Sequence, residues 1–101
     1  MASISDALEE LRKTYLAEPD PEKRERLRAE HDRAAAAALE LLGKAIGENT
    51  AAYNAAVDEL DKSVADLRTA SDDIAKVAEN IKKLAKAVDV IVGVAKKVAA
   101  A

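Results

Sequence analysis

The sequence predicts an all-α fold, in which a helical hairpin packs against a long third helix to form an antiparallel coiled coil or helical bundle. Apolar residues recur at helical spacing along most of the chain. Half of the residues are apolar, many of them alanine, and there is no Phe or Trp, which suits closely packed helices. No Gly or Pro occurs between Gly47 and Gly93. A chain of 101 residues fits one domain, residues 1–101.

The first predicted helix covers residues 4–17. Ser3 or Ser5 is a suitable N-cap, and Asp6 lies near the positive end of the helix dipole. We expect this helix to stop before Pro19. The apolar residues at helical spacing are Leu8, Leu11, Tyr15 and Leu16.

The second predicted helix covers residues 21–46. Asp20 is a natural N-cap, and Pro21 occupies the first helical position, where its missing N–H costs nothing. Gly47 is placed to adopt the left-handed conformation that ends a helix. The predicted inner face consists of Leu27, Ala34, Ala35, Ala38, Leu41, Leu42, Ala45 and Ile46.

The third predicted helix covers residues 50–98, which at 1.5 Å per residue is about 73 Å and far longer than the hairpin. Its apolar stripe alternates steps of three and four, as in a heptad repeat. The stripe consists of Val57, Leu60, Val64, Leu67, Ser71, Ile74, Ala78, Ile81, Ala85, Val88, Val92 and Ala95, flanked by Val77, Leu84, Ile91 and Val98. Val90 and Val94 point elsewhere and imply a second contact.

Two arrangements bury this stripe. In the first, the helix is continuous and its uncovered half is buried by a second copy or by a partner. In the second, the chain turns near Ser71, which caps a fourth helix, and the product is a monomeric four-helix bundle. We favour the continuous helix, because "TAS" lacks the Gly, Pro or Asn common in helix–helix turns.

The charge distribution predicts how two copies would pair. Residues 50–75 carry two basic and six acidic groups, whereas residues 76–101 carry six basic and two acidic groups. Antiparallel packing sets the acidic half against the basic half, so we expect an antiparallel homodimer, unless the polarity only complements the helix dipole. Exposed charge pairs are each worth about 0–1 kcal/mol, so the apolar stripe must supply the affinity.

The predicted function is a non-enzymatic helical module that binds itself or a protein partner through the C-terminal half of the third helix. The expected contacts are Leu67, Ile74, Ile81, Leu84, Val88, Ile91 and Val92. Lysines would form the rim and set orientation: Lys82, Lys83, Lys86, Lys96 and Lys97. The alternative is a small secreted or membrane-active protein, a secretion-system component or partner, whose residues 81–98 contact a lipid surface.

Other functions have little support in the residues. There is no Cys, the only His is His31 among charged neighbours, and Arg28 stands where a di-metal Glu-x-x-His motif needs Glu. We therefore expect no catalytic, metal or cofactor site. Nucleic-acid binding is disfavoured by the acidic net charge of −3 and by the lack of stacking aromatics. The sequence leaves localisation open: with neither a signal peptide nor a spanning segment, the default is cytoplasmic, and specialised export is compatible with the sequence.

The stretch from Ala7 to Leu27, with "ALEEL" before the turn "EPDP", resembles the helical hairpin of needle and rod subunits of type III secretion systems. The C-terminal half differs from that family. The resemblance implies only a helical hairpin, and no family is assigned.

Overall fold

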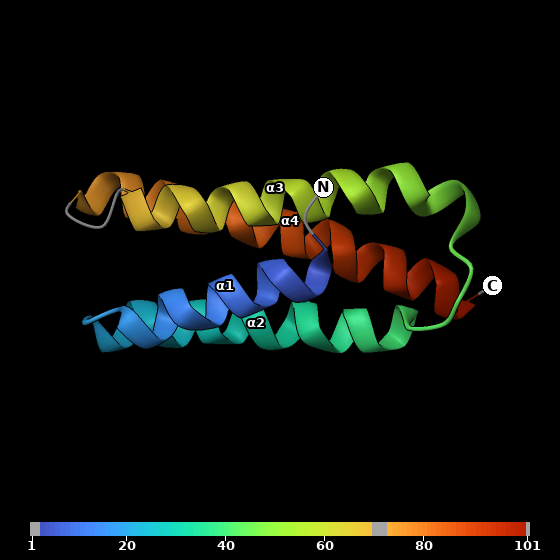
Figure 1. Cartoon of the computed structure of the whole chain (residues 1–101), viewed down its shortest axis with the longest axis horizontal. Coiled ribbons are helices and arrows are strands. Elements are labelled where there is room, and N and C mark those ends of the chain that lie inside the picture. Colours follow the sequence, from blue (N-terminus) through green and yellow to red (C-terminus); the bar gives the residue numbers. More distant parts are fainter. Residues whose placement is uncertain (1–2, 70–72, 101) are drawn as a thin grey trace.

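Four helices make up the computed structural model, which describes residues 3–69 and 73–100. They are α1 (Ile4–Ala17), α2 (Pro21–Leu41), α3 (Thr50–Thr69) and α4 (Ile74–Ala100), with a short 3₁₀ helix, η1 (Gly47–Asn49), before α3. Consecutive helices run in opposite directions along a bundle of 43 × 21 × 19 Å (Figure 1). The described part of the chain contains no strand, and the all-α prediction is confirmed.

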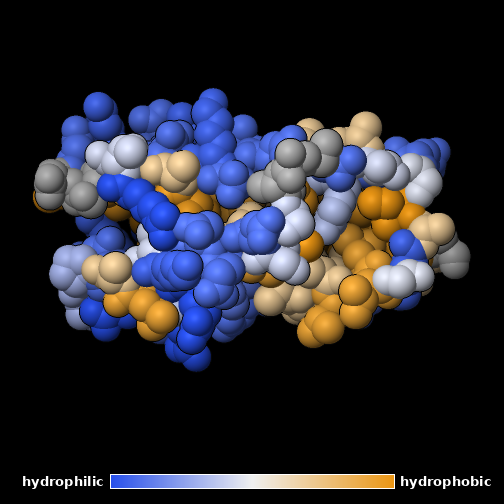
Figure 2. Space-filling view, in the orientation of Figure 1, coloured by the Kyte–Doolittle hydropathy of each residue, from blue (hydrophilic) through white to orange (hydrophobic). Residues whose placement is uncertain are grey.

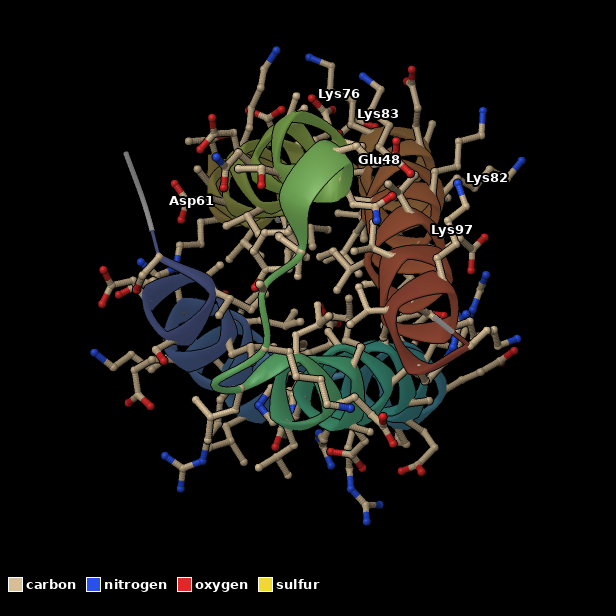
Figure 3. The ribbon with its side chains drawn as sticks, turned by 90° about the vertical axis from the view of Figure 1, so that its right-hand side faces the viewer. Glu48, Asp61, Lys76, Lys82, Lys83 and Lys97 are labelled. Carbon is tan, nitrogen blue, oxygen red and sulfur yellow. The ribbon has the colours of Figure 1, made fainter. Side chains whose placement is uncertain are left out.

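The helices occupy the corners of a square in the order α1, α2, α4, α3. Both α1 and α4 pack against α2 and α3. In the end view, α2 and α3 therefore lie diagonally opposite, and the segment between them crosses the end of the bundle (Figure 3). Helices that follow each other are neighbours for α1–α2 and for α3–α4, but not for α2–α3.

The single helix predicted over residues 50–98 is wrong, because the chain folds back between Thr69 and Ile74. Asp73 begins the new helix: its side chain accepts a hydrogen bond from the Lys76 N–H at 3.1 Å, and its carbonyl accepts one from Val77 at 2.9 Å. A capping aspartate thus starts α4 without Gly or Pro. The expected cap at Ser71 lies outside the described residues. The fold matches the alternative, a four-helix bundle within one chain.

The predicted starts of the first two helices are confirmed. The Ser3 hydroxyl accepts a hydrogen bond from the Asp6 N–H at 3.1 Å. The Asp20 carboxylate accepts one from the Glu22 N–H at 2.9 Å, and Pro21 is the first residue of α2. Each cap satisfies an amide that the helix itself leaves without a partner.

The second helix ends at Leu41 and not at residue 46 as predicted. Gly43 has a φ of +74°, a conformation that glycine adopts without steric cost, and it turns the chain out of the helix. Gly47, the predicted cap, also has a positive φ, of +47°, but it lies at the start of η1. This earlier end releases residues 42–46 to cross the bundle end.

The core runs along the centre of all four helices. Its largest fully buried side chains are Leu11, Leu27, Leu60, Leu84, Ile91, Val64 and Val88. Two polar residues, Ser63 on α3 and Asn80 on α4, are buried as well, and no hydrogen bond to the Ser63 hydroxyl is present within the described part of the chain. The longest helix, α4, contributes more buried residues than any other.

The first helix covers only part of the bundle. With 14 residues it is about 21 Å long, whereas the 27 residues of α4 span about 40 Å. Its amino end lies near the middle of the molecule (Figure 1). The corner between α2 and α3 therefore lacks a covering helix over the half that contains the ends of α2 and α4 and the start of α3.

Candidate interaction surface

Apolar side chains gather at this half of the molecule. In Figure 2 the left half of the surface is mostly hydrophilic, whereas on the right apolar side chains gather around a hollow. Leu39 and Leu42, at the end of α2, are 73% and 77% exposed. Ile46 and Tyr53 are partly buried against the core. We call Leu39, Leu42, Ile46 and Tyr53, with the uncovered sides of α2 and α3 around them, the open corner.

The side of α2 at the open corner is the same side that α1 covers elsewhere. The rings of Tyr15 on α1 and His31 on α2 meet edge to face, with centroids 5.6 Å apart. Ala35, Ala38 and Leu42 follow His31 at steps of three and four, so they lie on the same face one to three turns later. The open corner therefore continues the surface of α2 against which α1 packs, beyond the amino end of α1.

Two exposed ion pairs join neighbouring helices outside the open corner. Arg68 of α3 reaches Glu10 of α1, with Nη1 and Oε2 2.6 Å apart. Arg33 of α2 reaches Asp89 of α4, with Nη2 and Oδ1 2.7 Å apart. That hydrogen bond, together with the nearby Glu30 carboxylate, raises the pKa of the Arg33 guanidinium above its ordinary value. Both pairs are exposed, so they orient the helices more than they stabilise them.

Charges of opposite sign lie at the two ends of the exposed face of α2. Asp32 lies before the alanine run, and its Oδ1 is 3.1 Å from the His31 Nδ1. Lys44 lies after the run, 3.8 Å from the Glu40 carboxylate. The Asp32 side chain is 61% exposed and that of Lys44 48%. The segment between them, residues 34–42, contains one charged residue, Glu40.

Most of the residues predicted to bind a partner are buried inside the chain's own helical bundle. Those buried among its own helices are Leu67, Ile81, Leu84, Val88 and Ile91. Val92 is half-buried, and Ile74, at the start of α4, is 75% exposed. A partner that used the five buried side chains would first have to separate α4 from the bundle.

The predicted rim lysines all lie on the exposed side of α4: Lys82, Lys83, Lys86, Lys96 and Lys97. Those labelled in Figure 3 extend away from the core. Lys83 is 3.7 Å from Glu79, one turn earlier. The lysines thus surround a helix face whose largest exposed apolar side chain is Val90, at 45%. In the segment 81–98, predicted to contact lipid, most large apolar side chains are directed inward.

Sequence reasoning missed the outward position of Leu42 and the exposure of Leu39. The prediction places Leu42 on the inner face of a helix that continues to residue 46. One available signal is Gly43, which can end α2 as well as Gly47 can. The density of leucines in "LELL" is a second signal, since Leu39, Leu41 and Leu42 cannot all share one face of a helix.

The described residues include no group of three or more His, Asp or Glu side chains arranged to hold a metal ion. None of the helices, over the residues described, is long and apolar enough to cross a membrane.

Comparison with known proteins identifies no relative: no family model, curated protein or solved structure matches the chain. Function must therefore be inferred from the geometry and charge of the chain itself.

Proposed function

We propose that the chain is a non-enzymatic helical module that binds a protein through the open corner. The observation that carries the proposal is the exposure of Leu39 and Leu42 next to a bundle corner that α1 leaves uncovered. A single exposed leucine is ordinary on a protein surface, but several large apolar side chains around one hollow are typical of binding sites.

Burial of the open corner against a partner would contribute to the free energy of binding. A leucine side chain moved from water to an apolar contact contributes about 1.5–3 kcal/mol. The neighbouring alanines of α2 let a partner backbone approach closely, and the half-buried Tyr53 offers an aromatic contact of the kind enriched in interfaces. A helix is the expected binding element, because the open corner extends the surface of α2 against which another helix, α1, already packs.

Site-specific photo-crosslinking in the native cells tests the proposal. A photoreactive phenylalanine analogue at position 42 is expected to crosslink to a protein. The matched control carries the same residue at position 74, where Ile74 is an equally exposed apolar residue at the opposite end of the bundle. Crosslinking at position 42 and not at 74 supports the proposal; equal yields, or none at either position, contradict it.

A further inference from the structure

We infer that the protein that fills the open corner is a second copy of this chain, packed through the C-terminal half of α2 in an antiparallel, two-fold symmetric contact. The inference rests on the proposed function and names its partner. In this arrangement the end of α2 from each copy occupies the corner that α1 leaves open in the other.

A two-fold contact requires a surface that complements itself, because the same patch serves both copies. Residues 34–42 of α2 and its C-cap meet this requirement. Leu39 and Leu42 project from the helix, and small residues lie beside them at Ala35 and Ala38. When two such helices run antiparallel, the leucines of each can pack over the alanines of the other, as ridges into grooves.

The charges at the ends of this patch favour the antiparallel orientation. Asp32 lies at the amino side of the patch and Lys44 at the carboxyl side. Antiparallel packing brings Asp32 of one copy to the end where Lys44 of the second copy lies, whereas parallel packing brings like charges together. Residues 34–42 contain one charged residue, Glu40, and it lines the groove between α2 and α4.

Charge also limits the contact to this half of α2. The earlier half, residues 21–33, is dense in charged residues of both signs, and α1 packs against it. The uncovered half is long enough for a short helical contact, since residues 34–42 span about 13 Å. The two molecules would therefore overlap at their open ends and extend in opposite directions.

The solution mass of the purified chain, measured by light scattering over a concentration series, is the first test. We expect twice the 10.7 kDa of one chain. Replacement of two exposed leucines, Leu39→Gln with Leu42→Gln, is expected to raise the dimer dissociation constant roughly 10,000-fold, about tenfold for each of the four side chains that the two copies contribute. The matched control is Leu16→Gln with Ile74→Gln, at 60% and 75% exposed positions outside the patch, which should leave the dissociation constant unchanged.

A charge exchange tests the orientation. Asp32→Lys is expected to weaken the antiparallel dimer, because the introduced lysine would face Lys44 of the second copy, and a second change, Lys44→Asp, should restore it. In a parallel dimer Asp32→Lys would leave the like-charge opposition in place, and adding Lys44→Asp would bring no rescue. Circular dichroism of each variant checks that the helices persist.

The outcomes separate this inference from the proposed function. A chain that stays monomeric up to about 1 mM overturns the second copy as partner. If position 42 still crosslinks to a different protein, the proposed function stands without the inference. A monomer that also gives no crosslink at position 42 overturns both. A dimer that survives the leucine changes overturns the contact through α2.

Discussion

Two glycines show how much depends on the backbone at a single residue. Gly43 has a φ of +74° at the end of α2, whereas Gly93 lies inside α4 with helical geometry. A Cβ added at either position meets no neighbouring atom within 4 Å. Any effect of a methyl group at these positions therefore comes from the backbone and not from packing.

Alanine should change stability in opposite directions at these positions. Gly43→Ala is expected to lower the free energy of unfolding by about 1–2 kcal/mol, because an L-residue is strained at positive φ. Gly93→Ala should raise it by up to about 1 kcal/mol, through helix propensity. Urea unfolding followed by circular dichroism measures both, and each variant is the control for the other. Changes of the same sign would contradict the assignment of these two conformations.

At the scale of an element, α1 and α4 differ most in how firmly they are held. Only Ala7 and Leu11 of α1 are buried, whereas nine residues of α4 are. The contacts that join α1 to its neighbours include the exposed Glu10–Arg68 pair and the Tyr15–His31 contact. Since buried apolar area supplies most of the stabilisation, α1 is the element that needs least free energy to detach.

Hydrogen exchange should resolve this difference. Amides in the middle of α1 are expected to exchange faster than those in the middle of α3 and α4, through a local opening that leaves the other helices folded. Leu11→Ala should increase exchange in α1 far more than in α4. The measurement is mass spectrometry of peptides at increasing exchange times. Equal protection of α1 and α4 would show that the bundle opens only as a whole.

At the scale of the whole molecule, the diagonal connection decides how the bundle end is closed. Residues 42–49 cross from α2 to α3, and Tyr53, on the first turns of α3, packs against the core beside this crossing. Partial burial disfavours the charged phenolate, which raises the pKa of Tyr53 above its ordinary value. This pKa therefore reports whether the end of the bundle is closed.

The raised pKa predicts an alkaline loss of stability. The folded protein holds the Tyr53 proton more tightly than the unfolded chain does. The contribution is therefore complete below the unfolded pKa of about 10 and is lost as pH rises through the higher folded value. In a Tyr15→Phe variant, the near-ultraviolet absorbance of the phenolate follows Tyr53 alone. We expect a higher pKa in buffer than in denaturant; equal values would mean that the phenol is solvated in the fold.

The third predicted helix shows where prediction from the sequence stopped. Its apolar stripe was correct through Leu67, and Ile81, Val88 and Ala95 are buried as expected. Beyond the turn, however, the predicted flank residues Val77, Leu84 and Ile91 lie at the centre of the core. Ile74 and Ala78 face solvent instead, and Val94 is buried whereas Val90 is not. Once the helix is interrupted, the periodicity restarts with a new phase.

The sequence by itself determined the all-α class, the cap at Asp20, the choice of Ser3 or Ser5 as the first cap, and the end of α1. These features follow from hydrogen bonds and backbone preferences within a few residues. Only the tertiary structure decided that residues 50–98 fold back on themselves, that α2 stops at Leu41 and that α2 and α3 lie diagonally. Together these three features create the open corner. Each depends on how much apolar surface distant segments bury together, and no local pattern encodes that sum.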